Sequence, residues 1–394
     1  MFVDLSLIKV RQEEIMIYIV YPVLLIILFW GCRIYGRKEW NEEFLSLKQT
    51  KDLLGFAALC IMFHHIGQKN SASWIDKQYY TGGLEFFVPI GYVLVAFFTF
   101  CSGYGLYKSF KSKKNYLNSG FIKHHILTFV FLGYLVAWIF LAVRICLHEP
   151  MGDGRWVFYL SGLKLSNPNA WYVIVMPFFY MCFFFAFKFI KNEKIAFIAI
   201  ALFTFFYQLL GMAINHNDWW MRGEWWYNSI HLFPVGILVA MNESKIVQHI
   251  KRHYVLYMIL GLIVAVLAYF GKELIQTRFS YYEEFLVLPI KILRRMVCLA
   301  SEAIFSSAVV FYIFMIGMKV RIGNRFLKLM GSITLEFYLI HGLYVELFNY
   351  SFDGKVDSLI YIENSLLFTV IVFALSLPSA LLIKYIRKCT KISG

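Results

Sequence analysis

The 394-residue sequence contains few charged residues. Asp, Glu, Lys and Arg make up 16% of the chain, whereas 60% of the residues are hydrophobic and 19% are aromatic. A soluble domain cannot bury so large an apolar share. Apolar segments recur along the whole chain, and at about 17 to 25 residues each is long enough to cross a hydrocarbon core roughly 30 Å thick. The composition therefore predicts an all-α, polytopic integral membrane protein.

The sequence also lacks paired cysteines. We expect neither a disulfide framework nor a zinc or other metal site, because no CxxC pair occurs. A removable signal peptide is not expected either, since Glu13 and Glu14 precede the first apolar run and no small-residue cleavage site follows it. The cysteines stand singly, mostly inside apolar runs: Cys32, Cys60, Cys101, Cys146, Cys182, Cys298 and Cys389.

Eleven apolar runs predict eleven membrane spans. Residues 1–50 hold one N-terminal transmembrane helix and a cytoplasmic joint, and residues 51–394 form a membrane domain with the other ten spans. The predicted spans are residues 15–32, 53–67, 84–106, 126–147, 170–190, 195–214, 226–241, 254–271, 296–316, 329–349 and 359–385.

The net charge of +14 is explained by membrane topology rather than by nucleic-acid binding. Lys and Arg lie in the joints between spans, not along one soluble face. An N-terminus outside and a C-terminus in the cytoplasm put most of these cations on the inner side, as the positive-inside rule requires. We therefore expect a multi-pass protein of the plasma membrane whose first partner is the lipid bilayer.

Two adjacent histidines end one apolar run. The stretch FHHIGQKN contains His64 and His65, and ionisable side chains within a span are costly unless they face a cavity or a partner. His65 lies 14 residues beyond Lys51, about 21 Å further along a helix. His341 lies 13 residues beyond Lys328 on a span that runs the same way, so the two histidines are expected at a similar depth.

Other polar residues are predicted near the same depth. Histidines beside carboxylates suit proton abstraction, because imidazole can take and return a proton near neutral pH. The same groups would also serve as hydrogen-bonding struts between helices or as the path of a proton-coupled transporter. These residues are Asn228, His231 and Glu302, with Glu336 about two turns below His341.

Two basic segments have alternative interpretations. The first follows FCSGYGLYKS on the inner side and either anchors the chain to anionic lipids or grips a polyphosphate. The second, on the outer side, contains Arg294 and Arg295 and is either an interfacial segment or a site for an anionic group. The first segment comprises Lys108, Lys111, Lys113, Lys114, Lys123, His124 and His125.

The order and spacing of several motifs resemble the family-3 membrane acyltransferases, which O-acylate sugars of bacterial surface polysaccharides. The motifs are KDLLGFAALCIMFHH, FCSGYGLYKS, AWY at 170–172, WYNSIHLFPVGI at 226–237 and GSITLEFYLIH at 331–341, and the resemblance covers roughly residues 50–385. In that family a basic residue precedes the essential histidine by ten intervening residues. Here that position is Leu54, and Lys51 stands one turn earlier.

The resemblance implies a ten-span core, an acyl-CoA donor on the inner side and particular roles for the matching residues. His65 would be the catalytic histidine. On a helix His64 points about 100° away from it, so we expect His64 to brace a neighbouring helix by a hydrogen bond. Apart from the resemblance, an acyl-transfer mechanism would use Glu302 or Glu336 to orient an imidazole. The supporting positions would be Ser102, Gly103, Tyr104, Glu336 and His341, and the acceptor would be bound by Trp171, Tyr172, Asn228, His231, Arg294 and Arg295.

Two functions of different class follow from these patterns. The leading one is an O-acyltransferase that moves an acyl group, most simply acetyl, from acyl-CoA to a hydroxyl of a cell-surface or lipid-linked glycan. The alternative is a transporter or flippase of lipid-linked sugars, which would use the same polar level as a substrate path.

Overall fold

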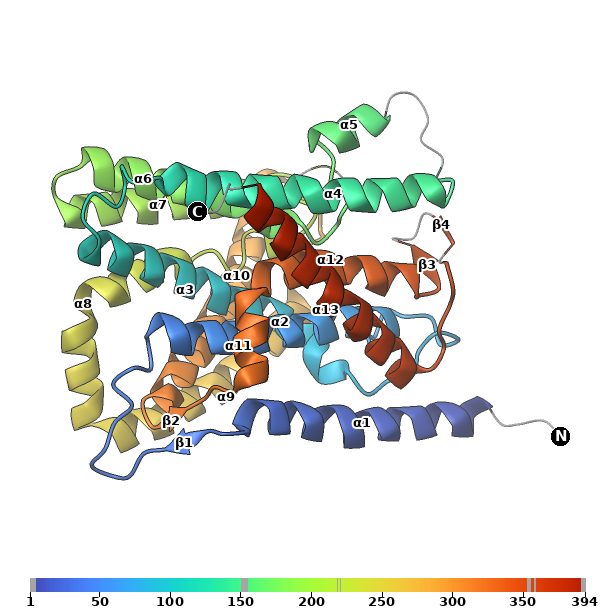
Figure 1. Ribbon diagram of the computed structural model, residues 1–394, viewed down its shortest axis with the longest axis horizontal. Helices are drawn as coiled ribbons and strands as arrows, with labels where there is room; N and C mark the ends of the chain where they lie inside the picture. The colour runs from blue at the N-terminus through green and yellow to red at the C-terminus, as the bar shows by residue number, and fades with distance from the viewer. Residues whose placement is uncertain are drawn as a thin grey trace.

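The computed structural model describes residues 5–149, 155–217, 219, 221–352, 356–357 and 359–390. The chain folds mainly into helices, and several long helices lie side by side along the longest dimension of the molecule (Figure 1). The helices of 14 or more residues are α1 (Leu5–Phe29), α2 (Leu47–Asn70), α3 (Gly91–Ser112), α4 (Thr128–Cys146), α6 (Trp171–Phe189), α7 (Glu193–Ala213), α8 (Leu232–Arg252), α9 (Tyr254–Arg278), α10 (Leu288–Gly317), α12 (Thr334–Leu347) and α13 (Ser365–Cys389).

Shorter elements connect these helices. Two antiparallel ladders join β1 to β2 and β3 to β4. The short elements are β1 (Arg33–Ile34), the 3-10 helix η1 (Glu85–Ile90), the π-helix η2 (Ile122–Leu127), α5 (Arg155–Ser161), the 3-10 helix η3 (Glu224–Trp226), β2 (Val320–Arg321), α11 (Arg325–Ser332), β3 (Ser351–Phe352) and β4 (Val356–Asp357).

Seven helices of the described chain are long and apolar enough to cross a membrane. This result supports a helical membrane protein, but it does not establish eleven spans. The seven are Glu85–Ser112, Ile122–Cys146, Trp171–Phe189, Glu193–Ala213, Tyr254–Arg278, Leu288–Gly317 and Ser365–Cys389.

Four predicted spans fall on other helices. Residues 15–32 fall on α1, whose side chains are described only after residue 12, and residues 53–67 fall on α2. Residues 226–241 end where α8 kinks, because Asn242 has the non-helical angles φ −121° and ψ 16°. Residues 329–349 contain the break between α11 and α12 at Ile333. Residues 1–4 and 391–394 lie outside the described chain, so the sides of the two termini remain predictions.

Glycines allow two close helix crossings that position the polar residues of the interior. A Cβ atom on Gly55 of α2 would lie 2.5 Å from the backbone nitrogen of Gly331 in α11. A Cβ atom on Gly103 of α3 would overlap the backbone carbonyl of Phe233 in α8. Only glycine permits backbones to approach this closely. The two crossings fix α2 against the segment that leads into α12, and α3 against α8.

Candidate active site

His65 and His341 form a hydrogen-bonded pair between α2 and α12. Nδ1 of His65 lies 2.7 Å from Nε2 of His341, and the two rings are nearly parallel, with centroids 4.9 Å apart. His341 is completely buried, whereas His65 is partly exposed. The structure therefore brings together two histidines that lie 276 residues apart in the sequence.

The hydrogen bonds determine which nitrogen of each ring carries the proton in the neutral pair. Nδ1 of His341 lies 2.8 Å from the carbonyl oxygen of Phe337, which only accepts, so Nδ1 carries the proton. Nε2 of His341 is then an acceptor for Nδ1–H of His65. Within the described chain no partner bonds to Nε2 of His65. In this tautomer Nε2 of His65 therefore carries a lone pair without a hydrogen-bond donor in the described chain.

His64 has a different environment from its neighbour. Its Nδ1–H donates to the carbonyl of Phe87 in η1 at 3.0 Å, and its ring packs against Gly91 at the start of α3. A Cβ atom on Gly91 would lie 2.5 Å from the imidazole. His64 thus braces α2 against η1 and the start of α3.

An ion pair that the sequence reasoning missed lies one turn beyond the histidine pair. Nζ of Lys69 is 2.9 Å from a carboxylate oxygen of Glu346, and Glu346 is buried while Lys69 is partly exposed. Lys69 follows His65 by four residues and Glu346 follows His341 by five, so both side chains project near the faces that carry the histidines. These spacings of four and five residues from the histidines were the sequence signal that could have predicted the ion pair.

Glu302 of α10 belongs to a second polar cluster, which includes α9, the segment after α9 and the segment that leads into α8. Its carboxylate accepts hydrogen bonds from Asn228 at 3.1 Å, Gln276 at 2.6 Å and Tyr281 at 3.0 Å. His231 joins the same region, since its ring contacts the Asn228 carbonyl and the Ser307 hydroxyl. Among the described residues, no hydrogen bond or ion pair links Glu302 to His65 or His341. The common depth predicted for these residues therefore corresponds to two separate clusters.

Glu336 pairs with Arg387 of α13. A guanidinium nitrogen lies 2.9 Å from Oε1 of Glu336, which is 1% exposed. Five residues separate Glu336 from His341, and no hydrogen bond between them is present in the described chain. Glu336 therefore joins α12 to α13 rather than orienting an imidazole directly.

A row of hydroxyl and imidazole groups leads from the histidine pair toward the basic loop. The ring of Tyr338 lies 6.3 Å from that of His341 and 5.9 Å from that of Tyr172. Further along, the hydroxyl of Ser102 lies 3.1 Å from that of Tyr180, whose ring lies 5.7 Å from that of His125. The row comes from α3, η2, α6 and α12.

A family model described as an acyltransferase domain, Acyl_transf_3, matches residues 53–385. The chain belongs to this acyltransferase family. No curated protein and no solved structure matches the chain. The family result shows a membrane acyltransferase in general terms, and it confirms the resemblance drawn from the sequence motifs.

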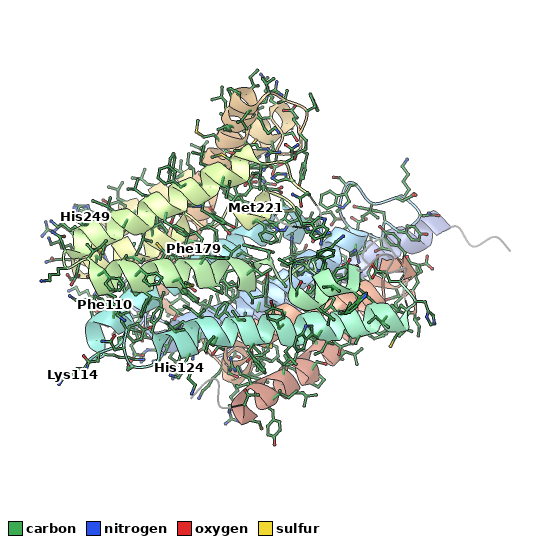
Figure 2. The ribbon with its side chains drawn as sticks, turned by 90° about the horizontal axis from the view of Figure 1, so that it is seen from above. Phe110, Lys114, His124, Phe179, Met221 and His249 are labelled. Carbon is green, nitrogen blue, oxygen red and sulfur yellow. The ribbon has the colours of Figure 1, made fainter. Side chains whose placement is uncertain are left out.

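The lysines of the acyltransferase's basic loop fall into two groups. Lys108 pairs with Glu243 at 2.7 Å and Lys111 pairs with Glu193 at 2.8 Å. Lys113, Lys114 and Lys123 are exposed and have no carboxylate partner in the described chain. Lys113 lies over the ring of Tyr116, whose hydroxyl is 2.7 Å from Nε2 of His125. Figure 2 shows Lys114 at one end of the acyltransferase, with His124 nearby.

Other residues carried over from the family motifs have packing roles. Gly103 allows the close approach of α3 to α8, and Tyr104 is buried with its ring stacked on Phe100. Trp171 is buried against Trp226, with ring centroids 6.5 Å apart. The SGYG and AWY motifs thus support the interior around Ser102 and Tyr172.

The arginine pair of the acyltransferase is already neutralised by carboxylates. Arg294 binds Glu283 at 2.6 Å and Arg295 binds Glu284 at 2.6 Å. Arg295 is 1% exposed and also donates to the carbonyls of Met212 and Ile214. These contacts favour a structural role for the pair over an open anion site.

A histidine with a buried side chain, His216, lies outside the spans and near Glu284, the partner of Arg295. Burial is the main cause that lowers the pKa of His216 to about 4. Nδ1 of His216 lies 3.2 Å from a carboxylate oxygen of Glu284, but with this lowered pKa the ring is neutral at pH 7 and the contact is not an ion pair there. In the described chain, no group of three or more His, Cys, Asp or Glu side chains has the arrangement of a metal site.

Proposed function

We propose that this membrane acyltransferase moves an acyl group, most simply acetyl, from acyl-CoA to a hydroxyl of a cell-surface or lipid-linked glycan. The observation that carries the proposal is the hydrogen-bonded His65–His341 pair, in which Nε2 of His65 has no partner in the described chain. A partly exposed imidazole with an unused lone pair, held in orientation by a buried group, has the arrangement of a general base.

In this proposal His65 acts on the acceptor hydroxyl. Nε2 of His65 takes the proton as the hydroxyl oxygen attacks the thioester carbonyl carbon, and the bond from that carbon to sulfur then breaks. The proton passes to the leaving sulfur, which regenerates neutral His65. His341 stabilises the imidazolium because its Nε2 accepts Nδ1–H of His65 throughout.

The donor would approach from the basic loop. Lys113, Lys114 and Lys123 are the loop lysines that no carboxylate of the described chain neutralises, so they fit the phosphates of a CoA group. The row through Tyr116, His125 and Ser102 continues from these lysines toward Tyr338 and His341. This continuous row of polar groups supports binding of the acyl-CoA donor at the end of the row where Lys113 lies.

The acceptor would approach from the Lys69 side. The Lys69–Glu346 ion pair lies there, and amide and hydroxyl groups follow within the next turn. Asn70 donates to the hydroxyl of Ser365 at 3.0 Å, and Thr81 contacts the same hydroxyl. Such groups can exchange hydrogen bonds with sugar hydroxyls. This polar environment supports a glycan acceptor.

Purified protein supplied with acetyl-CoA labelled in the acetyl group tests the proposal. The expected result is label transferred to a glycan acceptor, or slow release of labelled acetate when no acceptor is present. His341→Asn serves as a companion variant, because it removes the acceptor for Nδ1–H of His65 without removing the base. Donor that stays intact with acceptor present would contradict the proposal and favour a transporter.

A further inference from the structure

Helix α8 bends at its middle, and the part that follows the bend lines two cavities. Asn242 has non-helical backbone angles, and Figure 1 shows that the part of α8 after this residue crosses the end of the bundle instead of continuing along α3. Figure 2 shows His249, in this second part, at the same end of the molecule as Phe110 and Lys114. The second part of α8 therefore lies across the end of the bundle where the basic loop is found.

The cavity on one side of α8 is polar, and its cations are neutralised. It has a volume of about 560 Å³. Lys108 pairs with Glu243 at 2.7 Å, and Lys251 pairs with Glu42 at 2.6 Å. Each lysine that lines this cavity thus has its own carboxylate.

The cavity on the other side is apolar with a cationic mouth. It has a volume of about 800 Å³, and α9 and α10 supply an apolar wall that includes Leu260, Val264 and Phe311. At the mouth stand Lys245 and His249 of α8. Lys245 is exposed and has no carboxylate partner in the described chain. Nε2 of His249 lies 2.7 Å from the hydroxyl of Tyr257, which fixes the ring at the rim.

The apolar wall extends away from this mouth along the membrane-spanning helices. Tyr257 lies in the first turn of α9, and Val264 lies seven residues further, or about 10 Å along the helix. Leu260 and Val264 are 45% and 46% exposed, so the groove is open to the surrounding lipid at this depth. The groove thus has Lys245 and His249 beside the start of α9 and an apolar length along the apolar helix α9.

We propose that this groove binds one anionic phospholipid. An acyl chain lies along Leu260, Val264 and Phe311, and the phosphate contacts Lys245 and His249. The unneutralised lysine selects the occupant, because a cation at a membrane surface favours an anionic headgroup. The paired lysines on the opposite side of α8 offer no such attraction. The site lies on α8, α9 and α10, whereas the histidine pair lies on α2 and α12.

Native mass spectrometry of the full-length protein in detergent, titrated with dioleoyl phosphatidylglycerol or with dioleoyl phosphatidylcholine, tests this site. Wild-type protein should retain one phosphatidylglycerol in preference to phosphatidylcholine. Lys245→Gln should weaken phosphatidylglycerol binding about fivefold, the effect of one lysine at a membrane surface. Ala308→Trp, which fills the groove, should abolish retention.

Two matched variants serve as controls. Lys251→Gln removes a lysine of the polar cavity, and Leu262→Trp places a tryptophan on α9 at an exposed position outside the groove. Both should bind phosphatidylglycerol as wild type does. Equal retention of the two lipids, or no loss in Lys245→Gln and Ala308→Trp, would overturn the proposal in favour of ordinary boundary lipid. Loss of acyl-CoA binding in Ala308→Trp would overturn it in favour of a donor-chain site.

Discussion

The two buried polar clusters differ in what they leave unused. The carboxylate of Glu302 receives hydrogen bonds from three side chains on different parts of the fold, Asn228, Gln276 and Tyr281. In the His65–His341 pair, Nε2 of His65 has no bond within the described chain. A satisfied buried group stabilises the packing of helices, whereas an unsatisfied, partly exposed one is available for chemistry. Because Glu302 and the two histidines were predicted at a similar depth, depth in the membrane does not by itself identify a catalytic residue.

The largest expected effect comes from His65. His65→Ala should lower acyl transfer by roughly 10²- to 10⁴-fold, the contribution of a positioned general base. His64→Ala, its matched control, should leave the rate per folded molecule near that of wild type and lower the thermal midpoint, because it removes the contact with Phe87. Initial rates with labelled acetyl-CoA, normalised to folded protein, measure both. A larger rate loss in His64→Ala than in His65→Ala would indicate that His64 is the general base and that His65 has the structural role.

The next effect concerns His341 as a positioning residue. His341→Ala should lower acyl transfer by about 10- to 100-fold, as the loss of an outer partner of a functional histidine does elsewhere. His341→Gln should recover part of this rate, because its amide oxygen can accept Nδ1–H of His65. A purely structural role for His341 would instead give equal rates for the two variants and a common loss of stability.

A smaller effect is expected from the basic loop. Replacing both Lys113 and Lys114 with Gln should raise the KM for acyl-CoA about fivefold, since exposed ion pairs contribute roughly 0.2–1 kcal/mol each. The effect should shrink as salt rises. The double change of Lys108 and Lys111 to Gln is the matched control, because those lysines already pair with Glu243 and Glu193. If the two double variants raise the KM for acyl-CoA equally, the presence or absence of a carboxylate partner does not decide which loop lysines bind acyl-CoA.

The smallest effect on turnover is expected from Glu302. Glu302→Gln should leave the rate per folded molecule within about twofold of wild type, because the Glu302 cluster is separate from the histidine pair. It should lower the thermal midpoint, since one of the three donors loses its acceptor at a cost of roughly 1–3 kcal/mol. A rate loss comparable to that of His65→Ala, without a change in the thermal midpoint, would instead indicate that Glu302 takes part in the reaction.

The similar depth of His65 and His341 was predictable from the sequence for a physical reason. Both helices were expected to run the same way, so counting residues from Lys51 and from Lys328 gave similar depths. Counting residues along a helix gives only the depth of a side chain in the membrane. Which helices lie side by side depends on packing, such as the crossing of Gly55 with Gly331, and the sequence pattern does not contain it. For this reason Glu302 was placed near the histidines, and Tyr180 and Tyr338 were missed.

Hydropathy predicts apolar runs, and the structure does not turn each of the eleven runs into one long helix, for a related reason. An apolar run shows that residues avoid water, but it does not show where a helix kinks or stops. The predicted span 226–241 begins before α8, which starts at Leu232, and Ile333 separates α11 from α12 within the predicted span 329–349, so neither span forms one continuous long helix. The family membership, in contrast, rests on several short motifs in a fixed order, which the sequence displays directly.

Chemical rescue of His65→Ala asks whether the group that this variant lacks is an imidazole lone pair. Acyl transfer from labelled acetyl-CoA is measured with purified His65→Ala at increasing concentrations of free imidazole, with Glu302→Gln as the control. The account predicts that the low rate of His65→Ala rises with imidazole concentration while Glu302→Gln does not respond. A His65→Ala protein that transfers acyl groups at the wild-type rate without imidazole would contradict it.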